Sequence, residues 1–254
     1  MVYFFKMHSI KVEPKYNSNP NPRIGLIALA SDFMIEKDFI NVIKNREIDF
    51  FVNRIECYNP LTSENLIKMS EKVTEVTKDI LPDQKIDCVV YGCTSGTIAA
   101  GHNAIKEKVR LAKPEAKVST PSTAAIKALK KLNIKKISIF TPYSKILNDQ
   151  VVEYFKSEKF EVKSNSYFNI ESDFDIGKVD QNYLFKVLSN IDLNGADALF
   201  VSCTALPVLP IIEKLEKKLN KIVLSSNQAL IWDTLEKIGK NNSVEGFGKL
   251  FNKN

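Results

Sequence analysis

Histidine and cysteine are scarce in this chain of 254 residues, which has two histidines and four cysteines. The cysteines, at positions 57, 88, 93 and 203, form no CxxC pair, and with so few histidines the sequence predicts no metal site. No apolar run approaches the roughly 18 residues of a membrane span, and the opening MVYFFKM is too short for a signal peptide. We therefore expect a cytoplasmic protein with no membrane partner, whose thiols stay reduced.

Neither sign of charge dominates the chain. There are 36 lysines and arginines against 30 aspartates and glutamates, which gives a net charge of +6. The lysines alternate with glutamates, as in EKLEKKLNK (213–221), a pattern typical of solvated helix faces. No basic stripe is interleaved with aromatic residues, so we expect no nucleic-acid partner. Hydrophobic residues make up 44% of the chain, enough to bury a substantial core.

Short apolar runs alternate with stretches of helical period along the whole chain. Runs that are apolar on both faces, each followed by a helical stretch, are typical of a parallel sheet covered on both sides. The sequence therefore predicts an α/β fold. Seven runs are the expected strands: IGLIALA (24–30), DFFVNRI (49–55), DCVVYG (87–92), KKISIFTP (135–142), FEVKSNSYF (160–168), DALFVSC (197–203) and KIVLSS (221–226).

Three blocks recur in the same order in the two halves of the chain. RIGLIALASDF (23–33) is similar to KISIFTPYSK (136–145), DCVVYGCTSG (87–96) to DALFVSCTAL (197–206), and VSTPSTAAIKAL (118–129) to VLSSNQALIWDTL (223–235). We infer two pseudo-symmetric lobes, each a short, mostly parallel sheet flanked by helices. Lobe 1 is expected at 23–120 and lobe 2 at 121–225. Residues 1–22 are expected to form an N-terminal arm, and 226–254 a helix that returns to lobe 1 and a tail.

Cys93 and Cys203 occupy equivalent positions in this repeat, where a strand ends. Ligands of open parallel sheets bind at the carboxyl ends of strands, so we expect the two thiols to face each other across the cleft between the lobes. The residues after each cysteine are expected to start a helix, whose N–H groups lower a thiol pKa toward neutrality. Such a pair suits a reaction in which one thiol removes a proton and the other delivers one.

Hydroxyl and N–H groups near the two cysteines are the expected donors to a substrate carboxylate, and they make a metal or a cofactor unnecessary. The predicted substrate-binding residues of this kind are Thr94, Ser95, Ser122, Thr204 and Ala205. In the competing interpretation each thiol is a small core residue, but the equivalence of Cys93 and Cys203 in the repeat favours an active site. We assign Cys57 and Cys88, inside apolar runs, to the core, and His102 to a solvated helix.

The motifs GCTSGT and FVSCTALP, with RIGLIALASDF, TPSTAA, TPYS and SSNQALIW in chain order, resemble the aspartate/glutamate racemase superfamily. They are most similar to the branch of maleate cis-trans isomerases and arylmalonate decarboxylases, and within it to the ectoine-utilisation protein EutA. The likeness covers almost all of residues 23–238. It implies two α/β lobes, cysteine chemistry in the cleft and no cofactor, and by analogy it allows a homo-oligomer.

The resemblance also implies roles for individual residues. Arylmalonate decarboxylases keep only the second cysteine, whereas this chain has both, so decarboxylation is the weaker alternative. In maleate isomerases the first cysteine, matched here by Cys93, adds to the substrate double bond, and the second, matched by Cys203, handles the proton. A tyrosine that holds a substrate carboxylate there is matched by Tyr143.

Two asparagines that hold the carboxylates in maleate isomerases have no match. Asp32 and Asp173 stand at those positions and are included among the predicted substrate-binding residues. Since a carboxylate repels a substrate carboxylate unless it is protonated, we hypothesise a substrate that carries an ammonium or similar donor group. The alternative roles are a helix N-cap for Asp32 and a loop or N-cap residue for Asp173.

The sequence thus favours a cofactor-independent racemase or isomerase of a small amino or dicarboxylic acid, with Cys93 and Cys203 as an acid/base pair. Maleate-type isomerisation through a covalent cysteine adduct, and decarboxylation, are the alternative reactions. A further alternative, from another class, is a non-catalytic protein that binds a metabolite in the cleft.

Overall fold

Two parallel four-stranded sheets form the framework of the computed structural model, which describes residues 9–17, 21–240 and 243–252. The first sheet has the order β2-β1-β3-β4 and the second the order β6-β5-β7-β8. The order is the same in both, each strand being four places further along the chain in the second sheet. Their bounds are β1 (Arg23–Leu29), β2 (Asp49–Ile55), β3 (Cys88–Gly92), β4 (Lys117–Ser119), β5 (Lys136–Thr141), β6 (Glu161–Tyr167), β7 (Ala198–Val201) and β8 (Ile222–Ser225).

The predicted α/β fold with two similar sheets is confirmed. The central strands β1, β3, β5 and β7 are buried over nearly their whole length, as runs that are apolar on both faces require. All their pairings are parallel, and β1 and β3 pair from Ile24 with Cys88 to Ala28 with Gly92. β4 is absent from the seven predicted strands because three residues are too few to give a hydrophobic pattern.

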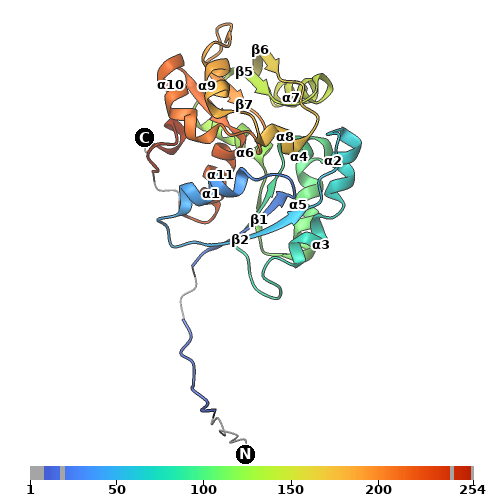
Figure 1. Ribbon diagram of the computed structural model, residues 1–254, viewed down its shortest axis with the longest axis vertical. Coiled ribbons are helices and arrows are strands. Elements are labelled where there is room, and N and C mark those ends of the chain that lie inside the picture. The colour runs from blue at the N-terminus through green and yellow to red at the C-terminus, as the bar shows by residue number, and fades with distance from the viewer. Residues whose placement is uncertain (1–8, 18–20, 241–242, 253–254) are drawn as a thin grey trace, which may run out of the picture.

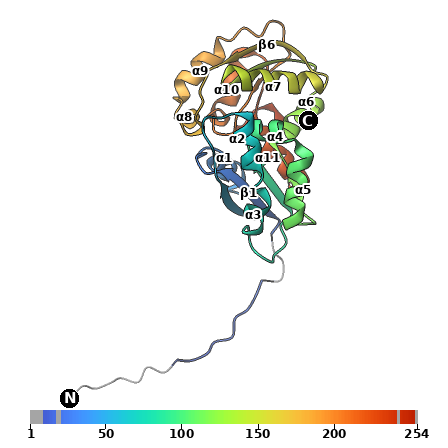
Figure 2. The ribbon, with the colours of Figure 1, turned by 90° about the vertical axis from the view of Figure 1, so that its right-hand side faces the viewer.

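Helices cover the two sheets, which form the lower and upper halves of the molecule in Figures 1 and 2. The chain breaks between α4 and α5 at Gly101, whose φ of 84° is readily available only to glycine. The helices are α1 (Ile35–Ile43), α2 (Ser63–Ser70), α3 (Val73–Lys78), α4 (Thr94–Ala100), α5 (His102–Ala112), α6 (Pro121–Lys131), α7 (Lys145–Ser157), α8 (Asp173–Gly177), α9 (Gln181–Ser189), α10 (Ile212–Leu219) and α11 (Ser226–Lys237), with 3-10 turns at Leu209–Ile211 and Lys249–Phe251.

Helix α11 links the two halves. It follows β8 of the second sheet directly, and it packs on α6 and α1 and on β3 and β4 of the first sheet. Ten consecutive residues of this helix, 226–235, are buried, so it is a core element and not a surface cover. The lobe boundaries at 120 and 225 stay predictions.

Two loops of the first half, after β1 and after β2, form hydrogen bonds with residues 171–173 of the second half. The Ser31 hydroxyl, after β1, donates to the Asp173 carboxylate at 2.6 Å. Asp173 in turn donates its backbone N–H to the side chain of Asn59, after β2, at 3.2 Å. Close by, the backbone N–H of Leu61 donates to the carbonyl of Glu171 at 2.8 Å. These three hydrogen bonds define the seam between the halves.

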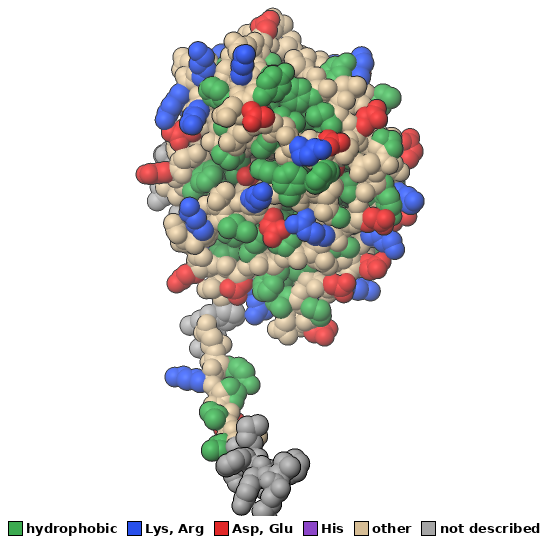
Figure 3. Space-filling model, viewed as in Figure 1, with side chains coloured by type: hydrophobic (Ala, Val, Ile, Leu, Met, Phe, Trp, Pro, Cys, Tyr) green, Lys and Arg blue, Asp and Glu red, His purple; other side chains and the backbone are tan. Residues whose placement is uncertain are grey.

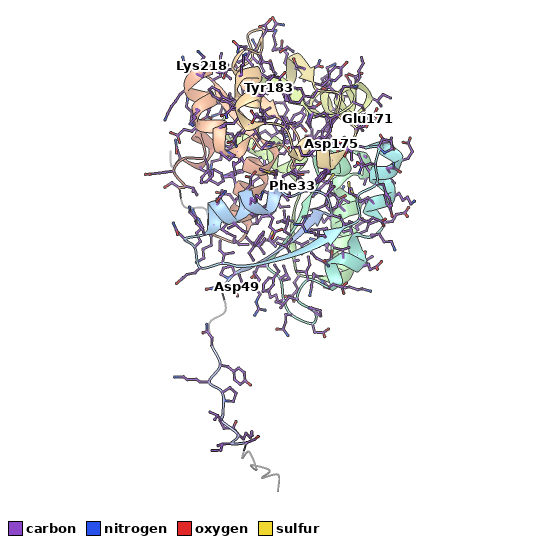
Figure 4. All side chains as sticks on the ribbon, in the orientation of Figure 1. Phe33, Asp49, Glu171, Asp175, Tyr183 and Lys218 are labelled. Atoms are coloured by element: carbon purple, nitrogen blue, oxygen red, sulfur yellow. The ribbon has the colours of Figure 1, made fainter. Side chains whose placement is uncertain are left out.

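Aromatic contacts extend the seam. The ring of Phe33 packs edge-on against Phe174 of α8, with centroids 5.7 Å apart. Gly177 lies so close to the Phe33 ring that a Cβ there would approach it to 2.7 Å, so any larger residue would require the Phe33 ring to move. Figure 4 shows Phe33 just below Asp175 of α8, where the two halves join.

Residues 9–17 run away from the body in an extended conformation (Figures 1 and 2). Ile10, Val12 and Tyr16 are more than four-fifths exposed there. The rest of the arm predicted at 1–22 includes 1–8 and 18–20, which lie outside the described residues. On the face of the body seen in Figure 3, acidic and basic side chains intermingle, as the alternating charge pattern predicts.

Candidate active site

Cys93 directly follows β3 and is the N-cap of α4. Its side chain is 3% exposed, and its sulfur accepts a hydrogen bond from the backbone N–H of Gly96 at 3.2 Å. The Ser95 hydroxyl lies 3.8 Å from the same sulfur. A Cβ at position 96 would come within 2.8 Å of the sulfur and 2.9 Å of the Tyr91 hydroxyl, so glycine is what lets the helix start approach the thiol. The predicted helix start after Cys93 is confirmed.

The chain after Cys203 takes a different course. Instead of starting a helix, it makes an irregular turn as far as the 3-10 helix at Leu209, so the prediction of a second helix start is wrong. Cys203 itself has a φ of 96°, a strained value for a residue with a Cβ. The turn still directs the backbone N–H of Ala205 at the Cys203 sulfur. Cys203 is 4% exposed.

Direct hydrogen bonds join the two cysteine segments. Ser226, the first residue of α11, accepts hydrogen bonds from the Thr94 hydroxyl at 2.8 Å and from the backbone N–H of Cys203 at 3.1 Å. The Thr204 hydroxyl donates to the carbonyl of Gly92, which precedes Cys93, at 3.1 Å. The structure therefore brings the two thiol-bearing turns side by side, although 110 residues (203 minus 93) separate them in the chain.

We expect Ser226→Ala to weaken this junction. The Thr94 hydroxyl and the Cys203 N–H would lose their common buried acceptor, at a cost of about 1–3 kcal/mol in the free energy of unfolding, measured by urea denaturation. Ser189→Ala is the matched control, because the Ser189 hydroxyl has no hydrogen-bond partner among the described residues, and its effect should stay within about 0.5 kcal/mol. Equal effects of the two changes would contradict the assignment.

Tyr143 lies against both thiols. It is 2% exposed, its hydroxyl lies beside Ser202 and Cys203, and the charges of Cys203 and Cys93 both act on it. Burial, and then these two thiols, raise the pKa of Tyr143 well above its usual value, so the phenol keeps its proton. A protonated phenol beside two sulfurs is a hydrogen-bond donor for a bound ligand.

Neither thiol has a pKa near neutrality. Burial raises the pKa of both Cys93 and Cys203 well above that of an exposed cysteine, and the N–H donors from Gly96 and Ala205 offset only part of this effect. The predicted lowering toward neutrality is therefore wrong, because removal from water outweighs the helix end. Both sulfurs are protonated in the ligand-free protein, and a thiolate formed in this setting is a strong base.

Asp32 has one oxygen engaged and one free. Its Oδ1 accepts hydrogen bonds from the backbone N–H groups of Met34 at 2.8 Å and Ile35 at 3.0 Å, so Asp32 binds the first N–H groups of α1 although the N-cap residue of that helix is Met34. Its Oδ2 has no hydrogen-bond partner among the described residues, although the Thr204 side chain lies beside the carboxyl group. Asp32 is 1% exposed, and burial raises its pKa.

Asp173 is the second buried carboxyl group of the site, at 2% exposure. It is the first residue of α8, whose N-cap is Ser172, so it is neither the loop residue nor the N-cap of the alternative interpretation. Burial, and then the charge of Asp32, raise its pKa to about 7. Its charge acts on both Cys93 and Cys203, which places it in the same cluster as the thiols.

The other predicted substrate-binding residues divide into two groups. Thr94 and Thr204 use their hydroxyls to join the two turns, while Ser95 and the N–H of Ala205 lie at the sulfurs. Ser122, on α6, is fully buried beside Tyr154 of α7, and no contact recorded for it involves a thiol. Substrate binding by all of these residues stays a prediction.

Two residues that hold the Cys203 turn in place, Asn227 and Asp38, were not predicted from the sequence. Asn227 donates to the carbonyl of Thr204 at 2.7 Å and to the carboxylate of Asp38, on α1, at 2.8 Å, and so holds the Cys203 turn against the first half. Asn227 lies in the repeated block SSNQALIW, and Asp38 is a charged residue on the buried side of α1 between Ile35 and Val42. The repeated block could have indicated Asn227, and the charge on an apolar helix face could have indicated Asp38.

We expect Asp38→Asn to stabilise the protein in a pH-dependent way. Burial, partly opposed by the Asn227 hydrogen bond, raises the pKa of Asp38 from 3.8 to about 7. Between these values the folded protein holds a proton that the unfolded chain releases, so stability falls as the pH rises through this range. Asparagine keeps the acceptor oxygen for Asn227 without the buried charge.

The expected gain in unfolding free energy is about 2–4 kcal/mol at about pH 8 and less than half of that at about pH 5, measured by urea titration. The exposed Asp79→Asn should show no such difference between the two pH values. A variant of Asp38 that is less stable at the higher pH would refute this account.

Cys57 and His102 differ from their predicted surroundings. Cys57 lies beyond the end of β2, is partly exposed, and neighbours Ser31 and Asp173, so its assignment to a core strand is wrong. Burial raises its pKa to about 11. His102 starts α5 and is half-buried, with Nδ1 3.0 Å from the Thr120 hydroxyl, so it is not fully solvated. Cys88 is buried in β3, as predicted.

The structure also bears on metal binding and on membrane insertion. Among the described residues, no three histidine, cysteine or acidic side chains cluster in a way that would hold a metal ion. Within the same residues, none of the helices combines the length and the apolar character needed to cross a membrane.

Comparison with known proteins agrees with this architecture. The maleate isomerase of Geobacillus stearothermophilus is 28% identical over 245 residues, which cover 90% of this chain and 96% of that protein. The crystal structure of the maleate isomerase Iso from Pseudomonas putida superposes with a TM-score of 0.84 at 24% identity, over 91% of this chain and 98% of the other. A Nocardia farcinica maleate cis-trans isomerase, a cysteine-to-serine mutant with a covalently bound succinylcysteine intermediate, gives 0.83 at 22% identity, over 91% and 98%.

The family comparison is decisive for membership. The model of the family described as arylmalonate decarboxylase matches residues 61–251, which include both cysteine turns, Tyr143, Asp173 and α11. This match spans three quarters of the chain, and the two-sheet fold agrees with it. The chain belongs to the arylmalonate decarboxylase family.

Proposed function

We propose that the chain is a cofactor-independent isomerase of a small carboxylic acid, with Cys93 and Cys203 as the reacting groups. The observation that carries this proposal is the junction at Ser226, where hydrogen bonds hold the two thiol turns together at one buried site. Tyr143, which is in contact with the second thiol and close to the first, supports the same assignment. The relatives named maleate isomerase support an isomerase as the class of enzyme.

In the first reaction, one thiolate removes the proton from the carbon next to the substrate carboxylate, and the other thiol delivers a proton to the opposite face. The enediolate formed in between carries extra negative charge, for which the Tyr143 hydroxyl and the N–H groups of Gly96 and Ala205 are available donors. Once formed, a thiolate at this buried site is a stronger base than an exposed one, because burial raises the pKa of both thiols. The outcome is racemisation or epimerisation.

In the second reaction, the Cys93 thiolate adds to a carbon–carbon double bond, rotation follows about the resulting single bond, and elimination of the thiolate gives the trans isomer. Cys203 delivers a proton to the neighbouring carbon and takes one back. The succinylcysteine intermediate in a similarly folded maleate cis-trans isomerase favours this candidate. The two reactions share the thiol pair and differ in whether a carbon–sulfur bond forms.

One set of measurements tests the proposal. The protein is incubated in heavy water with maleate and with a panel of small amino acids, and NMR follows formation of the trans isomer, loss of carbon dioxide and exchange of the α-hydrogen. Hydrogen exchange without a protein adduct in the mass spectrum supports the first reaction, and an adduct on Cys93 with maleate supports the second. A protein that binds these acids with unchanged affinity after Cys93→Ser, and that shows neither exchange nor isomerisation, would instead be a binding protein.

A further inference from the structure

The buried ionisable side chains near the thiols, other than cysteines and tyrosines, are all acidic. Among the described residues, six charged side chains are buried, and three of these, Lys113, Glu216 and Asp233, bond to protein groups away from the thiols. The other three are the aspartates at positions 32, 38 and 173. The cation that acts on Asp32 is Arg54, but its guanidinium group pairs with Glu36 at 2.6 Å. Nothing recorded there offers a positive charge to a ligand.

Hydrogen bonds place Asp32 and Asp173 near each other and near Cys203: Ser31, which precedes Asp32, donates its hydroxyl to the Asp173 carboxylate at 2.6 Å, and Thr204, which follows Cys203, has its side chain beside the Asp32 carboxyl group. The charge of Asp32 acts on Asp173, and the charges of both act on the Cys203 thiol. The Oδ2 atom of Asp32 is buried and has no hydrogen-bond partner among the described residues, so a donor group on a ligand would satisfy it. A ligand carboxylate placed beside Asp32 and Asp173 would be strongly repelled by their negative charge. A cationic donor on the ligand would instead bind the free oxygen of Asp32 and reduce the repulsion between the two carboxylates.

We propose that Asp32 and Asp173 form a subsite for a primary ammonium group, so that the substrate is a small zwitterionic acid with one carboxylate directed at the N–H groups beside the thiols. This inference rests on the proposed function, which places the reacting carbon between Cys93 and Cys203. An ammonium group next to the reacting carbon is the arrangement of an α-amino acid, and it favours proton transfer between the thiols over addition to a double bond.

Ligand affinity at this subsite is expected to depend on pH. The pKa of Asp173 is about 7 in the ligand-free protein because of burial and the neighbouring Asp32. A zwitterion binds best to the ionised form, so its affinity should rise between about pH 6 and about pH 8. A dianion needs the protonated form, so its affinity should fall over the same range. The titratable groups near Asp173 are Asp32 and the thiols of Cys57, Cys93 and Cys203, while Ser31 and Asn59 are its hydrogen-bond partners.

Matched ligand pairs test the inference on the full chain. L-aspartate and succinate, L-glutamate and glutarate, and L-alanine and propionate differ within each pair only in the amino group. We expect at least one amino ligand to bind at least about tenfold more tightly than its partner at about pH 8, by isothermal titration calorimetry, with an affinity that rises from pH 6. Tighter binding at that pH of maleate or of any partner without the amino group, or equal binding within all pairs, would overturn the inference.

Substitutions give the second arm of the test. Asp173→Asn should remove both the preference and the pH dependence, whereas Asp175→Asn, in the same helix but exposed and paired with Lys178, should keep them. If Asp173→Asn does not fold, the pH dependence of the unmodified protein decides alone. A preference that survives Asp173→Asn in folded protein would count against the subsite.

Hydrogen exchange separates this inference from the proposed function. Thiol-dependent exchange or isomerisation confined to acids without an amino group would leave the proposed function standing and remove the ammonium subsite. Conversely, Asp173-dependent binding of an amino acid that undergoes neither exchange nor isomerisation would keep the subsite and remove the proposed function.

Discussion

Serine in place of Cys203 is expected to lower turnover by about a thousandfold or more, and serine in place of Cys93 should do the same. A hydroxyl is a far weaker acid than a thiol, so the substituted side can no longer form the conjugate base or deliver its proton at a useful rate. Acid/base groups contribute about 10²–10⁴ to rates, and both steps of each turnover need the pair. Because the serine hydroxyl fits the space of the thiol, the fold should persist, as thermal unfolding can check.

The two variants should also differ from each other if protons are exchanged between the thiols. Each keeps the base on one face only, so each should exchange the α-hydrogen of one enantiomer and leave the other untouched, with opposite preferences. Cys88→Ala serves as the control, because Cys88 is buried in β3 and turnover should be unchanged. Turnover above about a tenth of the normal value in Cys203→Ser, measured by NMR, would refute the assignment.

Phenylalanine in place of Tyr143 is the second change with a large expected effect. The ring is fully enclosed and should stay in place, so only the hydroxyl beside Cys203 and close to Cys93 is lost. If that hydroxyl stabilises the charge that develops on the substrate carboxylate, kcat/KM should fall by about 10²–10³, as for other preorganised donors. The loss should appear mainly in kcat, because the donor matters most after the proton has left.

Tyr167→Phe is the matched control for this change. Tyr167 ends β6, is 40% exposed and has no recorded contact with a thiol, so its kinetic constants should not move. A Tyr143→Phe variant with normal kcat/KM would show that the phenol only fills space, and the carboxylate would have to be held by the N–H groups of Gly96 and Ala205 alone.

The fold and the thiol pair were predictable because both depend on local patterns. The central strands are apolar on both faces, and the repeated blocks place one cysteine at each of two equivalent strand ends, which is why two similar, mostly parallel sheets could be predicted from the sequence, although their strand order was not. The turn at Cys203 was not predictable in the same way. Its positive φ is supported by Ser226 and Asn227, which come from a helix more than twenty residues later.

The ionisation of the site was also beyond the sequence. The N–H donor at Cys93 is local and was expected, but burial comes from the meeting of the two halves, and burial dominates the thiol pKa. In the same way, the charge of Asp32 shifts Asp173 only because the folded chain brings together two residues 141 positions apart (173 minus 32). Similarity to EutA in particular, cytoplasmic location and assembly into oligomers stay predictions.

The hydrogen bonds that join Asp173 to Ser31 and Asn59 have a kinetic consequence. The thiols and the two carboxyl groups are at most 4% exposed, so we expect a small molecule to reach them when these contacts and the packing of Phe33 on Gly177 open. If this opening limits turnover, an increase in solvent viscosity should slow turnover without changing the proton-transfer step.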